Sequence, residues 1–182
     1  MEAGNLQSQV MNRSPGPDFE LREETGDDGP FLAALHRAAI LQAMGVAPDA
    51  ADPLMISLAE MQVRARALGY AADWPEARRR TAWIGPDRVG AVITSKGPGN
   101  LHVVDIAVAA AHRRRGVGRA MLAVVLSEAD GAGVETTARI LVSNIASRAL
   151  FAAAGFNLNG QPEDIQLVAR RPASPTSEAG RR

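Results

Sequence analysis

An apolar run, an arginine- and glycine-rich loop and a helical pattern follow one another in this chain and constrain its fold most. Residues 101–108 read LHVVDIAV, an apolar strand interrupted by His102 and Asp105. Residues 110–120 read AAHRRRGVGRA, and apolar residues recur with helical spacing over 118–129. A helix start offers unpaired N–H groups, and glycine lets the backbone approach a ligand closely. The segment therefore predicts a strand–loop–helix unit whose loop suits a phosphate or pyrophosphate.

The loop lacks the features of other familiar anion sites. A Walker loop ends in Gly-Lys-Ser/Thr, which is absent, and a dinucleotide fingerprint would need a glycine where Met121 stands. A nucleic-acid patch usually combines a basic face with aromatic residues, but this chain is 4% aromatic and its formal net charge is zero. We therefore expect no nucleic-acid partner. The local residues alone leave open a solvated turn whose arginines serve solubility.

The composition is that of one folded domain without thiol or metal chemistry. A chain of 182 residues, of which 46% are hydrophobic, is long enough to bury a core. Cysteine is absent, which excludes disulfides, thiolate nucleophiles and zinc–sulfur sites. The three histidines lack metal-ligand spacing, so no metal site is expected.

The sequence predicts a cytoplasmic protein without a membrane partner. No apolar run reaches the length of a membrane span, and the first residues lack the apolar core of a signal peptide. Lys96 is the only lysine among 20 basic residues. This arginine bias, together with the many alanines, is typical of a GC-rich bacterial genome.

The chain divides into a folded domain, residues 18–171, and two polar ends, residues 1–17 and 172–182, which we expect to be disordered. The order of elements in the domain predicts a single α/β domain with a mixed sheet. Gly69 is expected to end the second helix. The expected buried face of that helix comprises Leu54, Leu58, Met61, Ala65 and Leu68. The expected strands are 19–22, 81–84, 89–94, 101–108, 138–142 and 165–169, and the expected helices are 29–44, 54–68, 118–129 and 145–154.

Two separated motifs resemble the GNAT family of N-acetyltransferases. Residues 113–118, RRRGVG, match its acyl-CoA-binding signature, Arg/Gln-x-x-Gly-x-Gly/Ala. Residues 144–156, NIASRALFAAAGF, are similar to a second pattern, Asn-x-x-Ala-x-x-Leu-Tyr-x-x-x-Gly-Phe, except that Ser147 and Phe151 stand at the positions of the alanine and the tyrosine. The element order agrees from about residue 19 to 169. The resemblance implies a GNAT-like fold: a mixed, mostly antiparallel central sheet with a splayed strand pair and helices on both faces.

The resemblance also implies an activity, which is transfer of an acetyl group from acetyl-CoA, as cosubstrate, to an amine of a small molecule or peptide. The amine would attack directly in a ternary complex, and a homodimer is compatible with the family. The strand edge would pair with the pantetheine arm of the cosubstrate, and an N–H there would stabilise the thioester oxygen. The loop would wrap the pyrophosphate. The implied cosubstrate-binding residues are Ile106, Ala107, Val108, Arg113, Arg114, Arg115, Gly116, Val117, Gly118, Arg119, Asn144 and Phe151.

Several polar and aromatic positions bear on catalysis. Asp105 interrupts an apolar strand, where burial of a carboxylate costs free energy unless it is paired or has a function. It is therefore a candidate base or acceptor-orienting group, and a purely structural carboxylate is the alternative. Asn144 suits a helix N-cap as well as a cosubstrate contact. Tyr70 and Trp74 are expected near the acceptor cleft. No cluster of residues identifies the acceptor amine.

Phe151 departs from the family pattern. Many members have a tyrosine there, which protonates the departing thiolate, and phenylalanine cannot do so. A thiol with a pKa of about 8.5 still leaves tolerably as thiolate near neutral pH. The departure nevertheless motivates an alternative function, a non-catalytic acyl-CoA-binding regulatory module.

Overall fold

The computed structural model describes residues 19–161 and 163–174. Its strands form one sheet in the order β1-β2-β3-β4-β5-β7-β6, and every neighbouring pair is antiparallel except β4 and β5. The strands are β1 (Glu20–Glu23), β2 (Arg78–Ile84), β3 (Asp87–Gly97), β4 (Asn100–Val108), β5 (Glu135–Leu141), β6 (Asn157–Asn159) and β7 (Gln166–Arg171). The α-helices are α1 (Gly29–Ala43), α2 (Pro53–Asp73), α3 (Val117–Gly131) and α4 (Ile145–Ala153).

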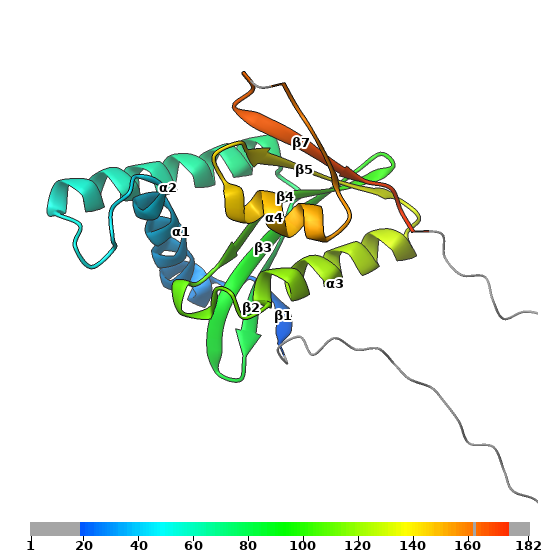
Figure 1. Cartoon of the computed structure of the whole chain (residues 1–182). Coiled ribbons are helices and arrows are strands. Elements are labelled where there is room, and N and C mark those ends of the chain that lie inside the picture. The colour runs from blue at the N-terminus through cyan, green and yellow to red at the C-terminus, as the bar shows by residue number, and fades with distance from the viewer. Residues whose placement is uncertain (1–18, 162, 175–182) are drawn as a thin grey trace, which may run out of the picture.

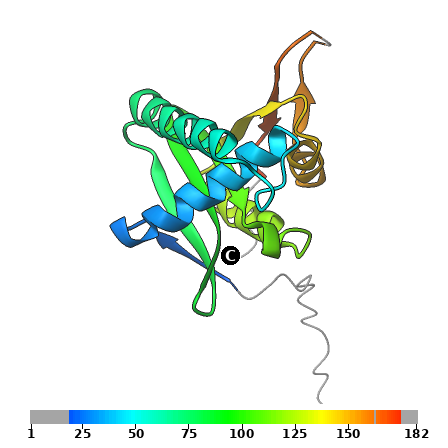
Figure 2. The same cartoon turned by 90° about the vertical axis from the view of Figure 1, so that its left-hand side faces the viewer.

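The helices cover both faces of this sheet, as the sequence predicts (Figure 1). The view turned by 90° shows α1 and α2 lying across one face (Figure 2). On the other face, α3 carries the apolar stripe expected from its helical spacing. The buried members of that stripe are Val117, Met121, Leu122, Val125, Leu126 and Ala129. The main core therefore lies between the sheet and the α3–α4 layer.

A bulge in β4 changes which side chains face that core. Ile93 of β3 pairs with Asp105, whereas its neighbour Thr94 pairs with Val103, so Val104 is an extra residue in β4. Before the bulge, Leu101 and Val103 belong to the core cluster under α3. After the bulge, Ile106 and Val108 pack on that side instead. The extra residue therefore turns the side chain of Asp105 toward the opposite face, where α1 and α2 lie.

The two parallel strands in the middle of the sheet splay apart. β5 pairs with β4 only over the segment from Asn100 to Val103. From Asp105 to Val108, β4 stays paired with β3, and no strand among the described residues pairs with its other side. The splayed strand pair implied by the resemblance is thus confirmed.

The second helix differs from its prediction. α2 runs through Gly69 and ends at Asp73, where the N–H of Trp74 donates to the carbonyl of Tyr70. The face predicted to be buried is largely exposed: Leu54 is 73% exposed, Met61 57% and Leu68 72%. α2 buries Ala59 instead, in a small cluster with α1. The apolar spacing was correct for a helix, but α1 covers a neighbouring face of it.

Two further differences concern the ends of the domain. β6 was missed because a three-residue strand leaves no periodic signal, and β7 extends two residues beyond its expected end. The expected disordered ends 1–17 and 175–182 lie outside the described residues. The rest of the expected tail, residues 172–174, is described, and the N–H of Ser174 donates to Oδ1 of Asp130 at 2.8 Å.

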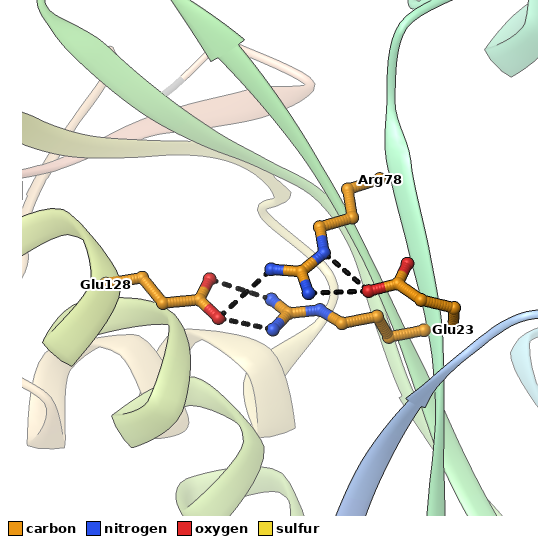
Figure 3. A network of polar contacts seen from close by, with 4 residues as sticks. Glu23, Arg78 and Glu128 are labelled. Carbon is orange, nitrogen blue, oxygen red and sulfur yellow. Dashed lines mark hydrogen bonds and ion pairs between the residues drawn. The ribbon is translucent and has the colours of Figure 1, made fainter.

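A network of charges fixes β1 and β2 against α3 (Figure 3). Arg80, only 3% exposed, donates to both carboxylate oxygens of Glu128 at 2.5 and 3.1 Å. Arg78 bridges Glu128 and Glu23. Each buried charge in this network is paired, which is the condition under which the interior tolerates it.

Candidate active site

Asp105 lies in a cavity between the sheet and the α1–α2 layer. The cavity has a volume of about 220 Å³, and His36 of α1 and Tyr70 of α2 also line it. Nδ1 of His36 is 3.6 Å from Oδ2 of Asp105, and the two side chains are only 14% and 19% exposed. The structure therefore places the predicted Asp105 beside a second titratable group in a sheltered pocket.

Burial sets the protonation states around Asp105. Burial lowers the pKa of His36 below its ordinary value; the negative charge of Asp105 opposes this lowering, and the positive charges of Arg66 and Arg79 add to it. His36 is therefore neutral near neutral pH, and its contact with Asp105 is not an ion pair under those conditions. Burial, and next the negative charge of Asp105, raise the pKa of Tyr70 to about 12. Tyr70 thus keeps its hydroxyl proton and remains a hydrogen-bond donor.

An aromatic group adjoins this cavity. Trp74 packs edge-on against Tyr70, with ring centroids 6.1 Å apart, and stacks on His102 at 5.6 Å. Nδ1 of His102 is 2.8 Å from Oγ1 of Thr137. Tyr70 lines the cavity, whereas Trp74 contacts Tyr70 and is not one of the lining residues. His102 has a structural role in the strand.

Three lining residues were not singled out from the sequence. His36, Arg66 and Arg79 come from α1, α2 and β2, and only tertiary structure brings them to Asp105. A weak signal existed for His36, because it stands four residues before the buried Ile40 and therefore on the inward face of α1. Nothing in the sequence distinguishes Arg66 and Arg79 from the many other arginines of the chain.

The open edge of β4 presents backbone groups to the gap between β4 and β5. The N–H of Ala109 donates to the carbonyl of Val89 at 2.9 Å, so this backbone position faces β3. Because strand positions alternate, the N–H groups of Ile106 and Val108 face the gap. The carbonyl of Val108 accepts a hydrogen bond from Nε of Arg113 at 3.0 Å on that side.

The loop after β4 has the backbone shape of an anion site. Arg114 and Gly116 both adopt left-handed conformations, with φ of 62° and 83°. Alternating backbone conformations of this kind turn successive N–H groups toward one point, and α3 starts at the next residue, Val117. Arg114, Arg115 and Arg119 are exposed around the loop. These residues fit a pyrophosphate group of the expected cosubstrate.

Arg113 holds this loop in place. Besides Val108, Arg113 donates to Oε1 of Gln42 and so joins the loop to α1. A Cβ added to Gly118 would lie 3.4 Å from Val108 and 3.6 Å from Leu150. Both distances are ordinary van der Waals contacts, so the packing of α3 on β4 and α4 does not by itself require glycine at this position.

The structure gives Asn144 and Phe151 local packing roles. Asn144 is the N-cap of α4, and its side chain accepts the N–H of Ser147 at 3.0 Å, as the capping alternative predicts. Phe151 is only 2% exposed and packs edge-on against Phe156 at 4.9 Å. Their contacts with a cosubstrate stay predictions.

A second cavity, of about 400 Å³, lies beside the loop. The turn between α1 and α2 contributes residues 45–48, and Ala110 and Arg113 close the other side. The turn lines this loop-side cavity and not the cavity that holds Asp105.

The described ranges 19–161 and 163–174 contain no group of three or more side chains suited to a metal ion. Within the same ranges, no helix is both long and apolar enough to cross a membrane.

The mixed sheet, its splayed parallel pair and the helices on both faces agree with the GNAT-like fold that the resemblance implies. The model of the acetyltransferase (GNAT) family matches residues 54–156. The chain therefore belongs to the GNAT acetyltransferase family.

Solved structures with low sequence identity share this fold. The PaiA N-acetyltransferase from Thermoplasma acidophilum, in complex with coenzyme A, is 10% identical, with a TM-score of 0.64 over 85% of this chain and 98% of its own. A Bacillus subtilis acetyltransferase in complex with CoA is 20% identical, with a TM-score of 0.58 over 86% and 98%. The ribosomal-protein-S18-alanine N-acetyltransferase from Escherichia coli is 18% identical, with a TM-score of 0.58 over 90% and 99%. A comparison with curated protein sequences found no match.

Proposed function

We propose that this protein transfers an acetyl group from acetyl-CoA to an amine of a small molecule or peptide by direct attack in a ternary complex. The observation that carries the proposal is the bulge at Val104. It leaves the N–H groups of Ile106 and Val108 at an open strand edge while it turns Asp105 into the neighbouring cavity. A site for the thioester and a site for the amine thus lie on adjacent residues of β4.

The open edge of β4 binds the acyl group and the pantetheine arm of acetyl-CoA. The amine nitrogen attacks the carbonyl carbon of the thioester, and negative charge develops on the carbonyl oxygen. The N–H of Ile106 stabilises that charge, and the pantetheine arm pairs with the remaining edge as an added strand would. The carbon–sulfur bond then breaks, and the sulfur leaves as a thiolate.

The cavity serves the amine. An amine is protonated in neutral water and must lose a proton before it attacks. Asp105 orients the amine by accepting its hydrogen bonds, and His36, neutral because burial lowers its pKa, accepts the proton. After the attack the nitrogen loses a second proton, which passes to the thiolate of coenzyme A, and His36 releases the first proton to solvent. The overall reaction therefore yields a free thiol, an amide and one proton.

The loop after β4 serves the pyrophosphate. The backbone N–H groups near Arg114 and Gly116, with the start of α3, form its main contacts. Arg115 and Arg119 add charge-assisted bonds from the exposed rim. Arg113 acts mainly by fixing the loop to β4 and α1.

Replacement of Asp105 by asparagine tests this function. With acetyl-CoA and a broad panel of small amines and peptides, release of free thiol by the unaltered protein is expected. Asp105→Asn should lower kcat/KM by roughly 10- to 100-fold, the value of one or two hydrogen bonds to a charged group, and leave coenzyme A affinity unchanged in calorimetry. The matched control is Asp87→Asn, at the start of β3 and outside the cavity. Normal activity per folded molecule together with a lower Tm would instead assign Asp105 a purely structural role.

Phe151 favours a second candidate, a non-catalytic acyl-CoA-binding regulatory module. The family's usual hydroxyl at this position is missing, and the ring is buried against Phe156. This candidate predicts tight coenzyme A binding, no thiol release with any amine, and no gain from a tyrosine at this position. A homodimer and a cytoplasmic, bacterial setting stay predictions.

A further inference from the structure

The cavity around Asp105 contains two arginines that the mechanism above does not use. Arg66 of α2 and Arg79 of β2 line it, and in the described ranges neither makes a side-chain hydrogen bond or ion pair with another residue. Elsewhere, structural arginines of this chain are paired with carboxylates. Examples are the pairs Arg80–Glu128, Arg88–Asp28 and Arg171–Asp130.

Charges of both signs act on His36 in this cavity: Asp105 raises its pKa, and Arg66 and Arg79 lower it. An acceptor with only an ammonium group would pair with Asp105 and leave both guanidinium groups without a counter-charge. Arg66 is exposed to solvent and Arg79 is half-buried, and the other walls of the cavity are mostly apolar. The cavity therefore favours a molecule whose own negative charge lies beside its amine.

The cavity also carries negative charge, at Asp105 and Glu24. It thus offers carboxylates for an amine and guanidinium groups for an acid. Its volume of about 220 Å³ is below the roughly 300–1,000 Å³ of sites for drug-sized ligands. A small molecule that carries both an amine and an acid fits this size and this charge arrangement.

We propose that the acceptor is a small amino acid, held by Arg66 and Arg79 through its carboxylate and by Asp105 through its amine. This substrate class rests on the proposed acetyltransferase function. Guanidinium groups suit the carboxylate because they offer planar, two-point hydrogen bonding. Acetylation then converts the amine to an amide and leaves the carboxylate unchanged.

A comparison of amino acids with their carboxamides tests the substrate class. Each standard amino acid and its neutral carboxamide are offered with acetyl-CoA, and kcat/KM is measured by thiol release. The best acid should exceed its amide by roughly 10- to 100-fold, the value of one or two charge-assisted hydrogen bonds. A series of ω-amino acids of increasing length reports the distance between the two binding points. Equal use of acids and amides would overturn the proposal.

Variants of the two arginines test their part. Arg66→Gln and Arg79→Gln should each raise KM for the acid roughly ten-fold or more and leave the amide unchanged. Arg79→Lys keeps the charge and should restore part of the preference, which guards against misfolding of the glutamine variant. The matched control is Arg64→Gln, on the same helix but outside the cavity lining. An equal effect on acid and amide would contradict recognition of the carboxylate.

A binding experiment tests the amino-acid substrate class independently of the proposed acetyltransferase function. The protein saturated with coenzyme A is titrated with the same acids and amides in a calorimeter. Binding of an acid in preference to its amide, lost in Arg79→Gln, supports the proposal even if no amine is acetylated. Absence of any such preference overturns it even if other amines are turned over.

Discussion

A single extra residue, Val104, decides what Asp105 can do. Without the bulge, strand alternation would point the carboxylate toward the core cluster that contains Leu122 and Phe151. A charge there would be buried without a partner, at a cost of several kcal/mol. With the bulge, the carboxylate lies beside His36 in the cavity. The role proposed for Asp105 therefore depends on the bulge at Val104.

Two histidines should make the fold sensitive to mild acid. Burial lowers the pKa of both His36 and His102 below the ordinary value of about 6.5. The unfolded chain then binds protons before the native protein does. The free energy of unfolding therefore has its full value, as far as these histidines are concerned, above about pH 6.5, and it decreases as the pH falls below that value.

Chemical denaturation at a series of pH values measures this loss. Each histidine contributes at most about 1.4 kcal/mol per pH unit to the slope of the unfolding free energy below about pH 6.5. His102→Gln should reduce the slope, because glutamine does not titrate. An unchanged slope in this variant would show that His102 is not desolvated as described.

Phe151→Tyr tests whether this position adjoins the thiolate. The added hydroxyl should raise turnover most at pH values below the thiol pKa of about 8.5, by less than the usual 10²–10⁴-fold because thiolate already leaves well. Phe156→Tyr is the matched control, since Phe156 packs against Phe151 in the same core cluster. The control should lose stability without any gain in rate. If Phe151→Tyr behaves like the control at every pH, its hydroxyl is buried without a partner and the position is structural.

At the scale of elements, the loop between β4 and α3 depends on one left-handed glycine. Gly116 has a φ of 83°, where a side chain costs about 1–2 kcal/mol. Gly116→Ala should shift the loop out of its anion-binding shape and lower coenzyme A affinity by roughly ten-fold. Calorimetry measures this affinity directly.

The control for Gly116→Ala is the same substitution at another glycine with a left-handed backbone conformation. Gly99, in the turn between β3 and β4, has a φ of 74° and no neighbour within 4 Å of an added Cβ. Gly99→Ala should lower stability comparably and leave the affinity unchanged. Equal affinity losses in both variants would mean that the loop geometry has no specific part in binding.

The sequence predicted the positions of helices and strands more accurately than it predicted which of their faces are buried. The stripe of α3 and the cap at Asn144 could be predicted, because helical spacing and capping are local. The buried face of α2 could not, since Leu54 and Leu68 have the correct spacing but the wrong neighbours. Asp105 was identified as an anomaly in an apolar strand. Its partner His36 depends on the packing of α1 on the sheet, which has no signature in the sequence.

At the scale of the whole molecule, the sheet separates two binding tasks. The splayed edge of β4 and the loop before α3 suit the cosubstrate, and the cavity under α1 and α2 suits the acceptor. The charge network around Arg80 and Glu128 holds β1 and β2 against α3 (Figure 3). β2 in turn pairs with β3, and β3 pairs with the bulged half of β4, where both substrates would meet.

Amide hydrogen exchange, with and without acetyl-CoA, tests most directly whether the open edge of β4 holds the cosubstrate. Calorimetry first establishes a saturating concentration. Slower exchange is then expected at the amides of Ile106 and Val108 and across residues 113–118, while the amides of β1 and β2 stay unchanged. Saturated protein in which Ile106 and Val108 exchange as fast as in the free protein would contradict the proposed acetyl-CoA site.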